Sequence, residues 1–160
     1  MSRVQLALNI ADLDQAVAFY TKLFGVEPAK LRPGYANFAV VEPPLKLVLI
    51  EGGGEPGSLN HLGVEVETTA QVADAQRRLS AEGLTTAVED EVACCYAVQD
   101  KVWVDDPNGA PWEIYTVLAD VEMAAGELRT VDPTSGAACC ASRPDLAGAT
   151  TDADAAAPCC

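Results

Sequence analysis

The sequence lacks a second histidine, any CxxC pair of cysteines and any apolar stretch long enough to cross a bilayer. Structural zinc sites usually draw their cysteines from CxxC pairs, so the cysteines present here do not predict one. A transmembrane helix needs about 20 predominantly apolar residues in a row, which excludes that class. Residues 1–10 also lack the charged start, apolar stretch and cleavage site of a signal peptide. We therefore expect a soluble, cytoplasmic protein.

Basic residues are few as well, since 10 Lys and Arg face 24 Asp and Glu, giving a net charge of −14 over 160 residues. This charge repels nucleic-acid phosphates and anionic membrane surfaces, so neither is expected as a partner. Hydrophobic residues make up 49% of the chain, which argues against disorder for most of it. The length predicts one domain with a tail.

The six cysteines form three adjacent pairs: Cys94 with Cys95, Cys139 with Cys140, and Cys159 with Cys160. Adjacent cysteines are poorly placed to join distant segments, so a disulfide framework is not expected. In a reducing cytosol they are expected as free dithiols. Two neighbouring thiols suit a soft ion or metalloid, because the first bound sulfur holds the second close by.

An internal repeat organises the first three-quarters of the chain. In each half an alternating strand leads into a capped helix that ends at a glycine, and further strands follow. In the first half we expect a strand at 4–10, a helix that begins at Asp12 and ends at Gly25, and strands at 35–41 and 45–51. In the second half we expect a strand at 60–67, a helix that follows Thr68 and ends near Gly83, and strands near 85–89, 98–104 and 111–118.

Equivalent positions of the two halves are 56 residues apart: Gln5 matches His61, Asp12 matches Thr68, and Gln15 matches Gln71. Three matches at one offset indicate a duplication. The predicted fold class is α+β, with two βαβββ modules (about 1–55 and 58–120) that pair into a curved mixed sheet around a metal cavity. The composition changes after about residue 120. Residues 121–160 are predicted to be a flexible acidic tail with two Cys-Cys pairs and one short helix candidate at 122–128.

Strand alternation places Gln5, His61 and Glu113 on the face opposite the apolar residues. Pairing of the two halves would bring Gln5 and His61 together, with Glu113 on an adjacent strand, while Ala7 and Gly63 leave room for a ligand. A lone histidine is usually structural. An amide oxygen, an imidazole and a carboxylate together suit Fe(II), Mn(II) or Zn(II). Three protein ligands leave coordination positions open, which favours a catalytic metal site.

The βαβββ repeat with candidate ligands on the first strand of each half resembles the vicinal oxygen chelate superfamily. This superfamily includes glyoxalase I, extradiol dioxygenases and bleomycin-resistance proteins. Three runs are more specific: PGYANF at 33–38, LNHLGV at 59–64 and ACCYAVQDKVWV at 93–104. Together they resemble the organoarsenical carbon–arsenic lyases and the related cadmium-induced proteins of actinobacteria, over roughly the first three-quarters of the chain.

This resemblance implies that Gln5, His61 and Glu113 are both the metal ligands and the catalytic residues, and that Cys94 and Cys95 bind the substrate. Many relatives are expected to carry histidine at the position of Gln5. Four-ligand glyoxalases have a glutamate where this chain aligns Leu47, so glyoxalase chemistry is not expected. The implied activity is Fe(II)- and dioxygen-dependent cleavage of trivalent organoarsenicals, such as methylarsenite or aromatic arsenicals, to arsenite for detoxification.

Several interpretations stay open at this point. Cys94 and Cys95 are expected on a loop before the strand at 98–104, although free cysteines are often simply small buried hydrophobes. Tyr96, Lys101 and Tyr115 are candidate pocket residues, although packing or a surface role is more usual for each. The tail cysteines, Cys139, Cys140, Cys159 and Cys160, either deliver substrate or act as buffering thiols.

Two other functions compete with the enzymatic one. A non-enzymatic resistance protein that sequesters cadmium or another soft ion would use the Cys-Cys pairs and the acidic surface. A drug-binding module of the bleomycin-resistance type leaves His61 and Glu113 without a role. The sequence predicts either a monomer or a homodimer.

Overall fold

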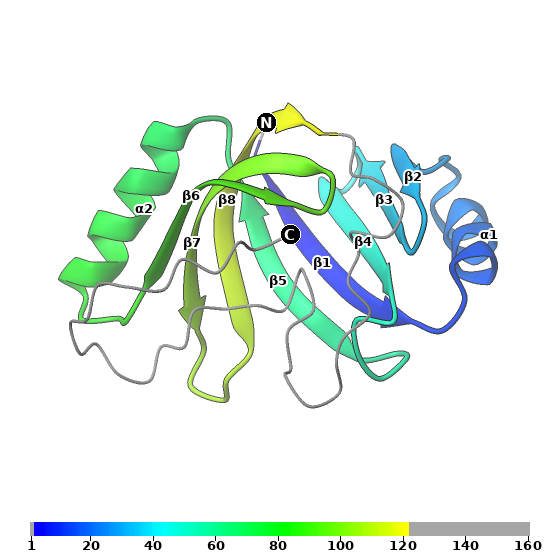
Figure 1. The fold of residues 1–160 in the computed structure, drawn as a ribbon, viewed down its shortest axis with the longest axis horizontal. Helices are drawn as coiled ribbons and strands as arrows, with labels where there is room; N and C mark the ends of the chain where they lie inside the picture. The colour runs from blue at the N-terminus through cyan, green and yellow to red at the C-terminus, as the bar shows by residue number, and fades with distance from the viewer. Residues whose placement is uncertain (1, 122–160) are drawn as a thin grey trace.

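The computed structural model describes residues 2–121, in which two helices and eight strands follow the order of two modules (Figure 1). The first module contains β1 (Arg3–Ile10), α1 (Leu13–Phe24), β2 (Lys30–Arg32), β3 (Tyr35–Val40) and β4 (Leu45–Glu51). The second contains β5 (Leu59–Glu65), α2 (Thr69–Ala81), β6 (Ala87–Cys94), β7 (Ala97–Asp105) and β8 (Pro111–Asp120). Both modules therefore have the predicted βαβββ order.

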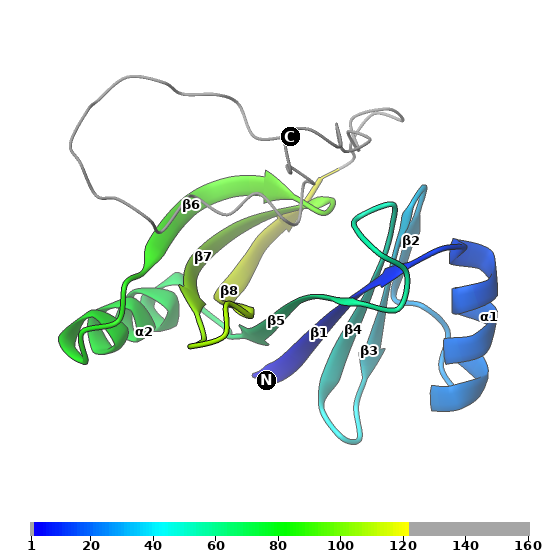
Figure 2. The ribbon, with the colours of Figure 1, turned by 90° about the horizontal axis from the view of Figure 1, so that it is seen from below.

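All eight strands belong to one sheet, in the order β2-β3-β4-β1-β5-β8-β7-β6. The first strand of each module pairs in parallel with the last strand of the same module, β1 with β4 and β5 with β8. The antiparallel pair of β1 and β5 joins the two modules within one chain. Figure 2 shows that the sheet curls into a trough, which confirms the predicted curved mixed sheet.

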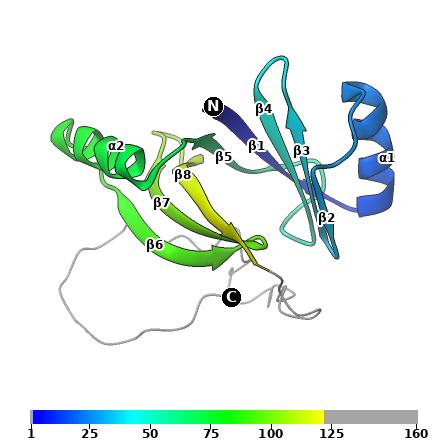
Figure 3. The same ribbon diagram turned by 90° about the horizontal axis from the view of Figure 1, so that it is seen from above.

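The two helices lie on the outer side of this trough, at opposite ends of the sheet (Figure 3). Their starts confirm the capping predictions, because the Asp12 side chain accepts a hydrogen bond from the Gln15 backbone N–H and Thr68 forms a full capping box with Gln71. Gly25 ends α1 in the left-handed conformation, with φ of 67°. Apolar residues under α1 form one core on the outer face, including Leu13, Phe38, Leu47 and Leu49.

The structure corrects two predictions about strands. β2 is three residues long and was not expected, because so short a strand has no detectable alternation. The strand predicted at 85–89 starts at Ala87 and continues to Cys94. Its pairing with β7 shifts between Glu89 and Val92, where Glu91 has a φ of 50°. This bulge interrupts the alternation from which the sequence pattern is recognised.

The turn between β7 and β8 is a hairpin turn in which Asp106 accepts hydrogen bonds from the backbone N–H groups of Asn108 and Ala110. Within residues 2–121 no helix is both long and apolar enough to span a membrane. The helix candidate at 122–128 and the predicted acidic tail lie outside the described residues.

Candidate functional site

Three polar side chains meet on the inner face of the trough, where β1, β5 and β8 run side by side. Gln5 of β1 is paired with Gly63 of β5, and Gly63 is paired in turn with Glu113 of β8. His61 lies two residues before Gly63, so its side chain points to the same face. A Cβ atom on residue 63 would lie 3.1 Å from Glu113 Cγ and 3.2 Å from Gln5 Cβ. The missing side chain of Gly63 therefore lets Gln5 and Glu113 meet across β5.

The three side chains are in direct contact and almost fully buried. Gln5 Nε2 donates a hydrogen bond of 2.6 Å to Glu113 Oε1 and lies 2.9 Å from His61 Nε2. His61 Nε2 lies 3.3 Å from Glu113 Oε1. The exposed fractions of Gln5, His61 and Glu113 are 3%, 4% and 3%. The structure thus brings together the three residues that strand alternation had placed on one face.

The orientation of the His61 ring is set by a chain of asparagines. Its Nδ1 lies 2.7 Å from Asn60 Oδ1, while Asn60 Nδ2 donates to Asn9 Oδ1 at 2.8 Å. Because the amide nitrogen of Asn60 is engaged with Asn9, its oxygen faces the ring, and Nδ1 carries the proton that it accepts. His61 Nε2 then keeps a lone pair directed at Gln5 and Glu113, which is the tautomer that a metal ligand requires.

Glu113 is charged although it is buried. Its Oε2 accepts a hydrogen bond of 3.1 Å from Lys101 Nζ. Burial would raise the pKa of Glu113, but the Lys101 charge and the contact with His61 outweigh it and lower that pKa to about 2. In return, the negative charge of Glu113 outweighs the effect of burial on Lys101 and raises its pKa. Lys101 is therefore a charge partner of Glu113, a more defined role than the pocket lining expected from the sequence.

A second polar cluster contacts the triad of Gln5, His61 and Glu113 through the Gln5 side chain. Tyr115 Oη donates to Gln5 Oε1 at 2.5 Å, lies 3.0 Å from Glu65 Oε2 and accepts a hydrogen bond of 2.9 Å from Lys46 Nζ. Arg3 binds Glu65 with two hydrogen bonds of 3.1 Å. The sequence contained no clear signal for this cluster, because its members come from β1, β4, β5 and β8.

The register of β4 corrects the alignment of Leu47 with the fourth ligand of glyoxalases. Leu47 packs in the core under α1, and Lys46 is the residue paired with Gln5. Lys46 points to the inner face, where it donates to Tyr115. An ammonium group at this position cannot serve as a metal ligand, so the corrected register still provides no fourth carboxylate.

Cys94 and Cys95 lie where β6 turns into β7: Cys95 is in a turn before the strand, as expected, whereas Cys94 belongs to β6. Cys94 is the last residue of β6, while Cys95 and Tyr96 form the turn with φ of 54° and 63°. Two successive positive φ values are typical of the tight hairpin turns that favour Asn-Gly, and they strain bulky residues. The two Sγ atoms lie 3.2 Å apart. Cys95 is disulfide-bonded, which corrects the expectation that all these thiols are free.

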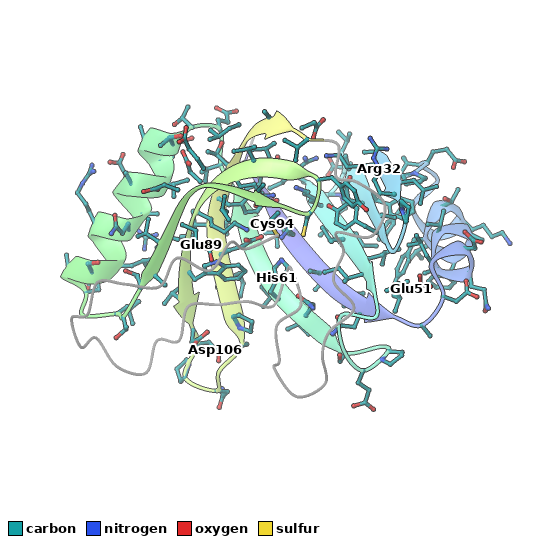
Figure 4. The ribbon with its side chains drawn as sticks, in the orientation of Figure 1. Arg32, Glu51, His61, Glu89, Cys94 and Asp106 are labelled. Carbon is teal, nitrogen blue, oxygen red and sulfur yellow. The ribbon has the colours of Figure 1, made fainter. Side chains whose placement is uncertain are left out.

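This turn is held against the first module. Tyr96 is buried with Tyr35, Val48, Ile50 and Ala7 in an apolar cluster on the inner face. Ala7 therefore packs against side chains and does not leave the space expected of it. Lys30 of β2 donates to the Tyr96 carbonyl at 3.0 Å and also pairs with Asp120. The end of the β6–β7 hairpin thereby spans the trough, as Figure 2 shows. In Figure 4 the side chains of Cys94 and His61 both lie over the middle of the sheet.

Comparison with known proteins shows the family of the chain. Residues 3–114 match the Glyoxalase/Bleomycin resistance protein/Dioxygenase superfamily. The chain belongs to this superfamily. It is 57% identical to a trivalent organoarsenical cleaving enzyme of Thermomonospora curvata, over 96% of this chain and 99% of the relative. It is also 55% identical to the cadmium-induced protein CadI of Mycobacterium bovis, over 88% of this chain and 93% of the relative.

Solved structures of the superfamily share its fold. An extradiol ring-cleaving dioxygenase from B. fuscum superposes with a TM-score of 0.54 at 22% identity, covering 75% of this chain and 34% of the dioxygenase. A Mn(II)-bound glyoxalase from Novosphingobium aromaticivorans superposes with a TM-score of 0.54 at 19% identity, covering 78% of this chain and 44% of the glyoxalase. At these identities the likeness shows the glyoxalase/dioxygenase fold.

The donor set of this superfamily member fits a divalent cation. It combines an imidazole nitrogen with its lone pair, a charged carboxylate and an amide, all within contact distance of one another. Residues 2–121 contain no group of three or more His, Cys, Asp and Glu side chains that could hold a metal ion. The site has two such residues, His61 and Glu113, and Gln5 supplies the third group. The amide now presents its nitrogen to the site, so its oxygen faces a cation only after the group turns.

Proposed function

We propose that this protein cleaves the carbon–arsenic bond of trivalent organoarsenicals, with Fe(II) and dioxygen, to release arsenite. The observation that carries the proposal is the pairing of two features on one inner face. Adjacent sulfur atoms 3.2 Å apart lie at a hairpin end that spans the trough, and a buried amide–imidazole–carboxylate triad lies within it. Relatives with 57% and 34% identity carry the name trivalent organoarsenical cleaving enzyme, which supports the same substrate class.

The two thiols bind the substrate in this proposal. In their reduced form, Cys94 and Cys95 displace the two hydroxyl groups of methylarsenite and form two sulfur–arsenic bonds, with release of two waters. A trivalent arsenic atom has only three substituents, so this fixes the direction of the remaining carbon–arsenic bond. The disulfide of Cys95 must be reduced first, because it occupies one of the two sulfur atoms.

The triad provides the reactive centre. Gln5, His61 and Glu113 would hold Fe(II), which supplies the binding and activation of dioxygen when it is bound. Glu113 contributes a full negative charge, since Lys101 keeps its pKa far below neutrality. Asn60 keeps the proton of His61 on Nδ1 and away from the triad. The inner face around these residues is buried, which limits the access of water.

The reaction balances without a further reductant. Methylarsenite and one dioxygen contain the same atoms as arsenite and formaldehyde. Arsenic stays trivalent, the methyl carbon is oxidised by four electrons, and dioxygen is reduced by four electrons. The carbon–arsenic bond is broken, while arsenic gains a hydroxyl and the carbon becomes a carbonyl. Arsenite release from the two sulfur atoms requires water and returns both thiols.

The test uses the full chain, reduced with a thiol reductant and loaded with Fe(II) without oxygen. After methylarsenite and air are added, arsenite and formaldehyde should appear in equal amounts. Cys94→Ser and Cys95→Ser should lose turnover and keep Fe(II) binding, whereas His61→Ala should lose both. Lys22→Met, at an exposed position of α1, serves as the matched control and should retain wild-type turnover. Absence of arsenite from reduced, Fe(II)-loaded wild type under air contradicts the proposal.

A second candidate is a non-enzymatic protein that sequesters cadmium or another soft ion through its cysteine pairs. The 55% identity to a cadmium-induced protein supports it. This function needs neither dioxygen nor the triad. Cadmium binding that survives His61→Ala, together with a lack of oxygen-dependent turnover, would favour it over the enzyme.

A further inference from the structure

The hydroxyl of Tyr115 has one proton to donate and two acceptor atoms within hydrogen-bond distance. Its single proton is directed at Gln5 Oε1 at 2.5 Å, while Glu65 Oε2 lies 3.0 Å away on another side. Lys46 Nζ already donates a hydrogen bond of 2.9 Å to the hydroxyl oxygen of Tyr115. When this proton is directed at Gln5, Glu65 Oε2 still accepts a hydrogen bond of 3.1 Å from Arg3 Nε and lies 3.4 Å from Lys46 Nζ.

The amide of Gln5 now blocks the atoms that the proposed metal needs. Its Nε2 carries two protons, and His61 Nε2 and Glu113 Oε1 both lie within hydrogen-bond distance of it. In this orientation the amide protons occupy the imidazole lone pair and a carboxylate oxygen. A protonated amide nitrogen offers a cation no lone pair, whereas the amide oxygen does.

A 180° rotation of the Gln5 amide group exchanges the positions of Nε2 and Oε1. Gln5 Oε1 then faces His61 and Glu113, and Nε2 faces Tyr115. The hydroxyl accepts hydrogen bonds from Gln5 Nε2 and Lys46, which fills both of its lone pairs, and its proton goes to Glu65. Around the triad, three groups with lone pairs face one another, which is stable when a cation lies between them.

We propose that Gln5 has two orientations, one that closes the site by hydrogen bonds and one that binds metal, and that Tyr115 is the positioning residue that stabilises the second. This inference rests on the metal site of the proposed function. Glu65 is the acceptor for the Tyr115 proton, and Arg3 holds Glu65 in place with two hydrogen bonds.

The first experiment measures the Mn(II) dissociation constant by calorimetry on the full chain, with thiols reduced and no oxygen present. Tyr115→Phe removes the acceptor for Gln5 Nε2 and should weaken Mn(II) binding by about 10- to 100-fold, the usual loss for a group that orients a ligand. Tyr35→Phe is the matched control, because Tyr35 is equally buried on the inner face and bonds Asn37 instead of Gln5. Its Mn(II) affinity should match wild type.

The second experiment separates orientation from packing. Both oxygens of a carboxylate are equivalent, so Gln5→Glu needs no choice of orientation. In the Gln5→Glu background, Tyr115→Phe should change the Mn(II) affinity far less than it does in the wild-type background. Should Tyr115→Phe fold poorly, Glu65→Leu tests the same exchange by removing the proton acceptor, and Glu65→Gln should restore most of the affinity.

Three outcomes are distinguishable. Equal losses of Mn(II) affinity on Tyr115→Phe in the wild-type and Gln5→Glu backgrounds would assign Tyr115 a packing role and overturn the inference. Wild-type binding with no loss in Tyr115→Phe would overturn the inference and leave the proposed function intact. A wild-type protein that binds no divalent metal would contradict both.

Discussion

Lys101 Nζ lies 3.1 Å from Glu113 Oε2, and both side chains are 4% exposed. An ion pair this deeply buried gains little over an apolar pair, because both charges lose their hydration. Removal of one partner is costly, since it leaves the other charge buried alone. The pair therefore keeps Glu113 ionised inside the sheet, where a neutral carboxylic acid would otherwise be favoured.

Lys101→Met is expected to lower the free energy of unfolding by about 3 kcal/mol at neutral pH, because Glu113 loses its partner. The measurement is urea denaturation of metal-free protein. Lys22→Met, at an exposed position, should change the same quantity by less than about 0.5 kcal/mol. Similar values for the two variants would mean that the Lys101–Glu113 pair contributes no more than a surface charge.

Metal-free protein should also lose stability in acid through Glu113. The pKa of this carboxyl is about 2 in the folded protein, below its ordinary value of 4.5. The unfolded chain therefore binds the proton more readily, and stability is fully present above pH 4.5 and falls as the pH drops toward 2. The loss is on the order of 3 kcal/mol. The free energy of unfolding, measured between pH 6 and 3, should fall in wild type and fall less in Glu113→Gln. Parallel curves for the two proteins would contradict this assignment.

Much of this site could be predicted from strand alternation and from the offset between the two repeats. The offset between Gln5 and His61 and the alternation around Glu113 were sufficient to place the three on one face. Helix caps at Asp12 and Thr68 were equally accessible, because a capping box is a local pattern. Features that depend on a local pattern or on the internal repeat were thus predictable.

Features that depend on register between distant strands were not. Lys46 and Tyr115 meet across β4 and β8, 69 residues apart, and no local pattern connects them. The Leu47 alignment failed by one residue, which in a strand exchanges the two faces. The tight hairpin turn at Cys95 and Tyr96 is not recognisable from the sequence, because its residues are not those that such turns favour.

Gly63→Ala is expected to damage the triad more than the fold. The added Cβ would lie 3.1 Å from Glu113 Cγ and 3.3 Å from Gln5 Nε2, so both side chains must shift by a few tenths of an ångström. The free energy of unfolding should fall by about 1–3 kcal/mol, as is usual for overpacking. Mn(II) affinity, measured by calorimetry, should fall at least about tenfold, as for a disturbed ligand shell. Unchanged affinity would show that Gly63 does not set the spacing of the ligands.

Asn60 tests whether the tautomer of His61 matters. Asn60→Ala removes the acceptor of the Nδ1 proton, so the ring can place its proton on Nε2 and lose the lone pair that faces Gln5 and Glu113. Mn(II) binding should weaken by about 10- to 100-fold. Asn60→Asp keeps an acceptor for Nδ1 and should retain most of the affinity, which separates the hydrogen bond from the volume of the side chain. If Asn60→Ala and Asn60→Asp weaken Mn(II) binding equally, the ring is oriented by its packing against Trp103, whose centroid lies 5.5 Å from that of His61.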